Sequence, residues 1–264
     1  MNLDLSGKTA LVSGSTAGIG LAIATELAQQ GALVIVNGRT DSRVNEAIAK
    51  ILADVPTAKL RGVAADLGTT QGCAGLVSVA PDVDVLVNNL GIFEPKPFEQ
   101  ITDADWLRFF EINVMSGVRL SRAYLPAMRE RKWGRIVFIS SESAVQIPAE
   151  MIHYGMTKTA QVAVARGLAE TTVNTGITVN SILAGPTASE GVQEFVGSLA
   201  AQRGMSAEEF EAEFFKSARP SSLLQRFIVP SEIAAMVAFV CSPAGSAVNG
   251  AALRVEGGVV RAAF

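Results

Sequence analysis

The fold of this chain is decided by a glycine-rich stretch near its N-terminus, Ser13-Gly14-Ser15-Thr16-Ala17-Gly18-Ile19-Gly20. The stretch follows a short apolar run and precedes residues of helical periodicity that begin at Leu21. Glycine allows positive φ and close approach of the backbone to a pyrophosphate, and a helix N-terminus supplies free N–H groups and positive potential. We therefore expect a dinucleotide to bind between the first strand and the first helix.

Apolar runs recur along the chain, with segments of helical periodicity between them. They predict strands at 10–13, 33–37, 61–65, 83–88, 135–140, 177–183 and 251–255. Runs that are apolar on both faces and separated by crossover helices are typical of a buried parallel sheet. The length of 264 residues suits one domain. The pattern predicts a single α/β domain over residues 1–264, a Rossmann-type, doubly wound sheet of seven parallel strands flanked by helices.

Two helices bear on the later argument, and the sequence indicates the ends of the first. Thr102 can cap the first, with Asp105 three residues further on, and Pro126 is expected to end or kink it. We place this helix at about 103–129 and the second at 152–171.

Residues 187–222 match no strand and carry phenylalanines among glutamates. A segment of this length that adds no strand to a compact domain is usually functional. We therefore predict a helical lid over the substrate, with a flap for contact between subunits as the alternative.

Composition favours a small-molecule partner. The formal charge is -3, and no basic block is present for nucleic acid or anionic lipid. Cys73 and Cys241 are the only cysteines, and the sequence has no His/Cys cluster for a metal, no apolar run of about 18 residues and no secretory signal. We expect a cytoplasmic protein without a metal, membrane or nucleic-acid partner.

Tyr154 and Lys158 lie four residues apart in the second expected helix, so their side chains share one face. A phenol with a pKa of about 10 is a poor base near neutrality, whereas a nearby ammonium favours the phenolate. The pair predicts Tyr154 as a general acid or base that Lys158 activates. Alone, such a pair is more often a packed aromatic ring beside a solvated amine.

Three other motifs precede this pair in the sequence. They are the spacing Gly14-x-x-x-Gly18-Ile19-Gly20, the loop Asn88-Asn89-Leu90-Gly91, and Ser141 thirteen residues before Tyr154. Together they resemble the classical short-chain dehydrogenase/reductase family, which includes the 3-oxoacyl-carrier-protein reductases. The resemblance covers almost the full chain and implies a homotetramer.

The resemblance implies a catalytic tetrad of Asn113, Ser141, Tyr154 and Lys158. In the family, the serine binds the substrate oxygen, and the asparagine holds a water that links the lysine to solvent. Ser140 is the neighbour of Ser141, but successive strand residues face opposite sides, so only one can face the site. The family spacing favours Ser141.

The resemblance also implies the residues that bind the cofactor: Gly14, Ser15, Thr16, Gly18, Ile19, Gly20, Arg39, Asp66, Leu67, Asn89, Gly91, Tyr154, Lys158, Gly185, Thr187 and Ser189. Asp66 corresponds to an aspartate that contacts adenine, and Leu90 departs from the family's alanine. After the sixth strand the family's proline is displaced. Either Thr187 or Ser189 can therefore supply the hydroxyl for the nicotinamide carboxamide.

The end of the second predicted strand bears on cofactor choice. An acidic residue there would bind the ribose of NAD and repel a 2′-phosphate. Gly38 occupies that position, and Arg39 can fork onto phosphate oxygens, although most loop arginines are simply solvated. NADP(H) is therefore favoured over NAD(H).

We predict hydride transfer between NADP(H) and a carbonyl/secondary alcohol pair, a small-molecule substrate. The alternatives are an NAD-preferring alcohol dehydrogenase that works oxidatively and a non-catalytic dinucleotide-binding sensor. Candidates for a partly apolar substrate pocket are Ile92, Phe93, Gln146, Ile147, His153 and the phenylalanines of the lid.

Two further features favour structural interpretations. His153 is the only histidine, and adjacent helix residues point about 100° apart, so a structural or pocket-rim position is expected beside Tyr154. The basic run Arg129, Arg131, Lys132 and Arg135 predicts a solvated helix end, with a docking site for an acidic carrier protein as the alternative.

Overall fold

The structure, a computed structural model, describes residues 1–192 and 204–263. In this part of the chain, seven parallel strands form one sheet with the order β3-β2-β1-β4-β5-β6-β7. The predicted fold class is confirmed, and each strand begins and ends within two residues of its predicted range. The strands are β1 (Thr9–Val12), β2 (Leu33–Gly38), β3 (Lys59–Ala64), β4 (Val85–Asn88), β5 (Gly134–Ser141), β6 (Ile177–Ala184) and β7 (Ala252–Val255).

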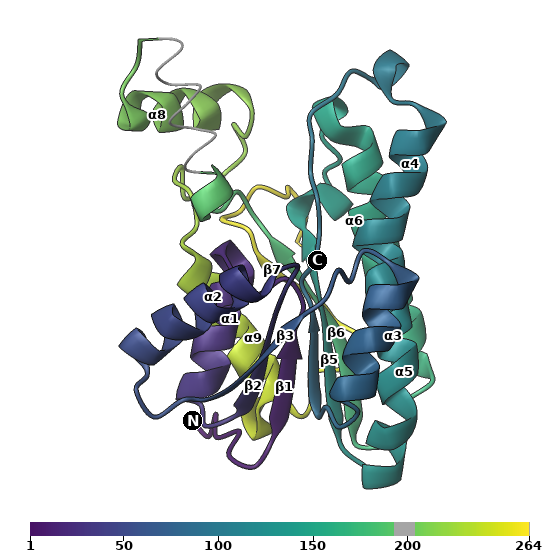
Figure 1. Ribbon diagram of the computed structural model, residues 1–264. Coiled ribbons are helices and arrows are strands. Elements are labelled where there is room, and N and C mark those ends of the chain that lie inside the picture. The colour runs from purple at the N-terminus through teal and green to yellow at the C-terminus, as the bar shows by residue number, and fades with distance from the viewer. Residues whose placement is uncertain (193–203, 264) are drawn as a thin grey trace.

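Helices cover both faces of the sheet (Figure 1). One layer holds α1 (Gly18–Gln29), α2 (Asp41–Asp54) and α9 (Pro230–Cys241). The other holds α3 (Thr70–Val79), α4 (Asp103–Phe110), α5 (Ser116–Arg131) and α6 (Ile152–Glu170), while α8 (Ala207–Ser217) projects beyond the sheet. Short 3-10 helices lie at Phe98–Gln100, Glu142–Ala144, Ala149–Met151 and Pro243–Gly245. Apolar side chains form two buried clusters, so the core lies along the sheet.

The two edge strands are less buried than the sequence analysis expects. The inner strands are almost wholly buried, but every residue of β3 and β7 is exposed or only partly buried. An edge strand has a neighbour on one side only, and charged side chains are common there. Lys59 and Arg61 on β3 follow this rule. The prediction of burial on both faces was therefore wrong for these two strands.

The helix predicted at 103–129 is found in three segments. They are α4, a π-helical turn at Glu111–Met115, and α5. Thr102 caps α4, and Asp105 completes a capping box, as predicted. Pro126 lies inside α5 and does not end it, so the predicted end was wrong. Buried side chains on both sides of Pro126 offset the cost of about 3 kcal/mol for an interior proline.

The strand order places the site. From β1 the chain builds outward to β3 and then returns to β4 on the other side of β1. In sheets of this kind, ligands bind in the crevice at the carboxyl ends of the strands where the order reverses. The glycine-rich loop follows β1, and the Asn88–Gly91 loop follows β4. Within the described ranges, no helix has the length and apolar character needed to cross a membrane.

Candidate active site

The glycine-rich loop presents an open helix N-terminus. Gly14 and Gly18 have φ values of 62° and 54°, which favour glycine. Ala17 is the N-cap of α1 and makes no side-chain cap hydrogen bond, and the first turn has no acidic residue. The first N–H groups of α1 and its positive end are therefore available to an anion. This is the arrangement that binds a pyrophosphate.

Ser13 and Asn89 join this loop to the loop after β4. The Ser13 hydroxyl accepts hydrogen bonds from the backbone N–H groups of Asn89 (2.9 Å) and Leu90 (3.0 Å). The Asn89 Nδ2 donates to the carbonyls of Ser13 (3.0 Å) and Gly14 (3.1 Å). The Leu90 side chain lies beside Gly14, so this departure from the family pattern fills space without displacing Asn89. Both loops line a cleft of about 250 Å³.

Asn37 holds the other side of the glycine-rich loop, and the sequence analysis gave it no role. Its Oδ1 accepts the Gly14 N–H (3.1 Å), and its Nδ2 donates to the carbonyls of Val63 and Ala65 on the β3 side (both 3.1 Å). Its backbone N–H donates to the buried Ser15 hydroxyl (2.9 Å). The buried Ser15 side chain therefore helps to hold the glycine-rich loop against β2. The sequence signal for this role was a polar residue, Asn37, directly after an apolar run.

Gly38 and Arg39, the residues predicted to choose the cofactor, lie at the carboxyl end of β2. A Cβ at position 38 would collide with the methyl group of Thr16, so an acidic side chain there would require Thr16 to move. Arg39 is exposed, and the described residues give its guanidinium no hydrogen-bond or ion-pair partner. The carboxyl end of β2 therefore carries an exposed positive charge and no carboxylate at position 38.

Asp66 and Leu67 follow β3 at the same edge. Asp66 is exposed, and one of its carboxylate oxygens accepts the Gly68 N–H (3.0 Å). The Leu67 side chain lies in the core. Leu67 can therefore offer a cofactor its backbone only, whereas Asp66 keeps acceptor capacity toward solvent.

A second cavity, of about 330 Å³, adjoins the first and shares Asn89 and Gly91 with it. Ser141, Tyr154 and Lys158 line it together. Ser140 has its hydroxyl bonded to the Lys158 carbonyl (2.9 Å). The structure thus brings three of the four predicted tetrad residues to one cavity.

Tyr154 lies with its ring edge-on to Phe93, 6.5 Å between centroids. Burial raises its pKa above the ordinary value, and the carboxylate of Glu142 raises it further. A hydrogen bond with Ser141 and the charge of Arg219 act in the opposite direction. The protonated phenol is therefore the dominant form of Tyr154 near neutral pH.

Lys158 is buried beside this phenol. Its Nζ donates to the Ile139 carbonyl (2.9 Å) and lies 5.6 Å from the centroid of the Tyr154 ring. Burial lowers the pKa of Lys158 to about 8, and Glu142 acts against that shift. Lys158 is therefore mainly an ammonium at pH 7, poised to lose its proton in mildly alkaline solution.

Asn113 sits in the π-helical turn and does not line the cavity directly. Its Oδ1 accepts the Ile92 N–H (2.8 Å), and its Nδ2 donates to the Ile92 carbonyl and the Thr157 hydroxyl (both 3.0 Å). Its backbone carbonyl accepts from Gln161 (2.6 Å). The side chain therefore fastens the loop after Gly91 to α6. π-Helical turns often occur at functional sites.

Comparisons with known proteins agree with this geometry. The short chain dehydrogenase family model matches residues 8–198. The chain belongs to this family. It is 51% identical to the uncharacterized oxidoreductase YvaG of Bacillus subtilis over 100% of both chains. It is also 34% identical to the D-beta-hydroxybutyrate dehydrogenase of Cupriavidus necator, over 97% of this chain and 99% of that one.

A solved structure extends the agreement to three dimensions. The L-sorbose reductase of Gluconobacter frateurii, in complex with NADPH and L-sorbose, superposes with a TM-score of 0.92. It is 29% identical, and the match covers 99% of this chain and 100% of that one. The chain is thus a short chain dehydrogenase and an oxidoreductase, of a family that uses a nicotinamide dinucleotide.

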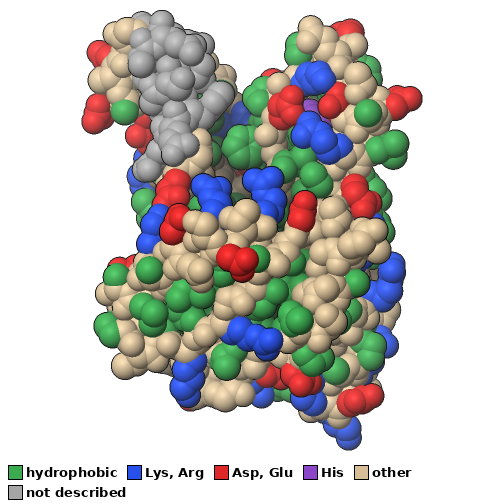
Figure 2. All heavy atoms as spheres, viewed as in Figure 1, with side chains coloured by type: hydrophobic (Ala, Val, Ile, Leu, Met, Phe, Trp, Pro, Cys, Tyr) green, Lys and Arg blue, Asp and Glu red, His purple; other side chains and the backbone are tan. Residues whose placement is uncertain are grey.

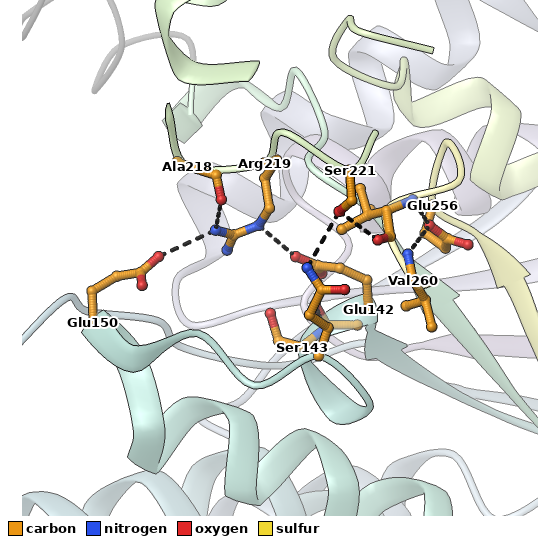
Figure 3. Close-up of polar contacts among 12 residues, drawn as sticks. Glu142, Ser143, Glu150, Ala218, Arg219, Ser221, Glu256 and Val260 are labelled. Atoms are coloured by element: carbon orange, nitrogen blue, oxygen red, sulfur yellow. Dashed lines mark hydrogen bonds and ion pairs between the residues drawn. The ribbon is translucent and has the colours of Figure 1, made fainter. Parts of the chain in front are cut away.

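This short chain dehydrogenase has a charged pair at the cavity that the sequence analysis missed. Glu142 follows Ser141 and is 4% exposed, and Arg219, which is 9% exposed, follows α8. The Arg219 Nε donates to the Glu142 Oε1 (3.0 Å), and the other Glu142 oxygen accepts from the Ser141 hydroxyl. Figure 3 shows the two side chains pointing toward one another across the site. No sequence motif joins residues so far apart.

Thr187 and Ser189 both line the substrate-side cavity, so the structure keeps both candidates for the carboxamide. The Thr187 hydroxyl donates to the Gly185 carbonyl (2.8 Å), whereas Ser189 lies against Gly18. Ser189 also borders the cleft of the glycine-rich loop. Of the two candidates, Ser189 is thus the one that lines both cavities.

Some of the residues predicted to form the substrate pocket line this cavity. Ile92 and Phe93 line the cavity, as do Phe210 and Phe214 of α8. Figure 2 shows hydrophobic side chains in the hollow on this face of the molecule. Gln146 and Ile147 lie elsewhere, because the Gln146 amide bonds to Ser221 (3.3 Å) and Ile147 packs against Gly155. Part of the predicted lid, 193–203, lies outside the described residues.

His153 does not line the pocket, so that part of its prediction was wrong and its structural role is supported. Its ring is fully buried, 4.0 Å from the centroid of Phe109 and 6.0 Å from that of Trp106. The described residues offer neither ring nitrogen a hydrogen-bond partner. Burial therefore lowers the pKa of His153 below its ordinary value of 6.5.

This burial predicts acid sensitivity of the fold. In the unfolded chain His153 takes up a proton below about pH 6.5, whereas the folded protein resists protonation. The unfolded state then binds more protons, so the free energy of unfolding should decrease as pH falls through and below 6.5. Urea unfolding of the wild type and of His153→Phe at pH 7.5 and 5.5 checks this. A fall in stability that is equal in both proteins would contradict the prediction.

The basic run lies at the amino end of β5, opposite the cavity. Arg129 donates to the Thr171 carbonyl (3.0 Å), and Arg131 donates to the Val83 carbonyl (2.7 Å). Arg135 is buried and bonds to the carbonyls of the neighbouring turns. These guanidinium groups bind helix and strand ends, which favours the structural interpretation over a carrier-docking site. The prediction of a solvated group was wrong for Arg135, which lies buried in β5.

Within the described ranges, no group of three or more histidine, cysteine or acidic side chains is placed to hold a metal ion.

Proposed function

We propose that this short chain dehydrogenase transfers a hydride between NADP(H) and a carbonyl/secondary alcohol pair, with Tyr154 as the proton-transfer residue. One observation carries the proposal. Ser141, Tyr154 and Lys158 converge on an apolar-lined cavity that adjoins the glycine-loop cleft. A non-catalytic sensor would not require these three groups at one cavity.

The residues present fit a dinucleotide. A Cβ at Gly20 would collide with the Gly14 carbonyl and the Asn89 amide, so the loop is built closely around a bare backbone. Gly14, Gly18 and Gly20 with the α1 N-terminus would hold the pyrophosphate, Asp66 the adenine, and Thr187 or Ser189 the carboxamide. When bound, the nicotinamide supplies or accepts the hydride.

The side chains supply proton transfer and orientation. In reduction, the protonated Tyr154 donates to the oxygen of the substrate as negative charge develops there. The Ser141 hydroxyl turns from Glu142 and donates to the same oxygen, and the Lys158 ammonium stabilises the phenolate that remains. The water path past Asn113 that the family resemblance implies would then return a proton. In oxidation, the same groups act in reverse.

The preference for NADP(H) rests on Gly38 and Arg39. The solved L-sorbose reductase is a complex with NADPH, which supports the same preference by similarity. The relatives act on different compounds, D-beta-hydroxybutyrate in one case and L-sorbose in another. An NAD-preferring dehydrogenase that works oxidatively is the alternative.

Arg39→Ala should weaken NADPH binding about 10- to 100-fold, because a charge-assisted hydrogen bond to an anion is worth about 1.5–3 kcal/mol. NADH affinity should stay the same, and it serves as the internal control. Fluorescence titration of both proteins with both nucleotides measures the four affinities. Tighter binding of NADH than NADPH by the wild type would instead favour the oxidative dehydrogenase.

The remaining expectations stand as proposals. Phe210 and Phe214 line the cavity from α8, which supports a lid over the substrate. β7 is a half-exposed edge strand, which supports subunit contact there in a homotetramer. We place the protein in the cytoplasm on its sequence.

A further inference from the structure

The carboxylate of Glu142 lies one hydrogen bond beyond the serine that we assign to the reacting oxygen. Ser141 donates to one Glu142 oxygen, and Arg219 donates to the other (Figure 3). A carboxylate has about four acceptor positions. The two bonds use two of them, so Glu142 keeps acceptor capacity at the wall of the cavity that it lines.

The cations at this wall are already engaged. Arg219 donates through Nη1 to Glu150 (3.2 Å) and to the Ala218 carbonyl (2.8 Å), in addition to Glu142. Lys158 donates to the Ile139 carbonyl. Among the described lining residues, two carboxylates thus face two cations, and both cations have partners. A substrate carboxylate would meet like charge from Glu142 and Glu150, and it would share Lys158 and Arg219 with the groups that they already bind.

An unpaired buried charge is costly, while a hydroxyl that donates to a carboxylate forms a strong hydrogen bond. The remaining wall is apolar and includes Phe93, Met151 and Phe214. We propose that the substrate is an uncharged ketone or secondary alcohol with a hydroxyl on the carbon next to the reacting carbon, and that this hydroxyl donates to Glu142. The proposal rests on the function proposed above.

Three four-carbon ketones test the proposal. Butan-2-one, 1-hydroxybutan-2-one and 2-oxobutanoate share a carbonyl at the second carbon and differ only at the first, which carries hydrogen, a hydroxyl or a carboxylate oxygen pair. With saturating NADPH, the wild-type kcat/KM should be about 10- to 100-fold higher for the hydroxyketone than for butan-2-one, from one hydrogen bond to a charged group. It should be lowest for 2-oxobutanoate.

Glu142→Gln separates this recognition from a general loss of activity. The ratio of kcat/KM between the hydroxyketone and butan-2-one should fall toward one, and the discrimination against 2-oxobutanoate should weaken, because Arg219 loses its buried counterion. A common loss of turnover cancels in the ratio. Glu170→Gln, which removes the acid of an exposed pair with Arg166 on α6, is the matched control and should keep the wild-type ratio.

The outcomes distinguish the two proposals. A wild type that reduces 2-oxobutanoate or butan-2-one as well as the hydroxyketone overturns the substrate class and leaves the reductase function in place. An unchanged ratio in Glu142→Gln overturns the role of Glu142 in the same way. A protein that binds NADPH but reduces none of the three ketones contradicts both proposals.

Discussion

Replacement of Tyr154 by phenylalanine is expected to lower kcat by about 10²- to 10⁴-fold, the usual contribution of a positioned proton-transfer group. The hydroxyl is the only part of the side chain that is lost, so the ring should keep its edge-on contact with Phe93. NADPH affinity should therefore change little. Single-turnover reduction, compared with fluorescence titration of NADPH, separates the two effects.

The chain offers a matched control in its other tyrosine. Tyr124 is buried, and its hydroxyl donates to the Ala80 carbonyl (2.9 Å), away from the cavity. Tyr124→Phe should cost about 1 kcal/mol of stability and leave turnover per folded molecule unchanged. Near-normal turnover in Tyr154→Phe, or an equal loss in Tyr124→Phe, would contradict the assignment of Tyr154.

The sheet was predictable because each strand can be recognised from its own short stretch of sequence. Short apolar runs between longer segments of helical periodicity can bury both faces only in a parallel sheet with crossover helices. That reasoning holds for inner strands such as β5 and fails at β3, where burial depends on which strands come to lie at the edge. Edge position is a property of the topology, and no single segment carries it.

The candidate site also contains some residues that the sequence identified and others that only the fold brings together. Tyr154 and Lys158 are brought together by one helix, and Ser141 was chosen over Ser140 from family spacing, so these residues were found from the sequence. Glu142 was visible beside Ser141, but its partner Arg219 reaches the cavity only through the fold.

Two other features depended on packing. Asn37 gains its role only when β1, β2 and β3 lie side by side, because its side chain binds the loops that follow two of them. His153 looked like a pocket residue because it adjoins Tyr154. The helix turns it instead toward Phe109, where burial and not chemistry determines its pKa.

Gly20→Ala should disrupt cofactor binding most strongly among single-methyl changes in the loop. Its added Cβ would collide with the Gly14 carbonyl and the Asn89 amide, which together join the loops after β1 and β4. Backbone and a bonded amide cannot move aside without breaking that junction, so we expect about 1–3 kcal/mol of destabilisation from overpacking. NADPH affinity should fall at least about tenfold, since the loop that receives the pyrophosphate shifts.

Gly167→Ala is the matched control for this change. Gly167 lies in α6, and a Cβ added there meets nothing within 4 Å. Alanine in a helix interior should stabilise the protein by about 0.5–1 kcal/mol and leave NADPH binding as it is. If the packing argument holds, urea unfolding shows that Gly20→Ala is destabilised and Gly167→Ala is stabilised. NADPH titration then shows weaker binding in Gly20→Ala only. If Gly20→Ala binds NADPH as tightly as Gly167→Ala does, the close backbone approach at the glycine-rich loop is not what holds the cofactor.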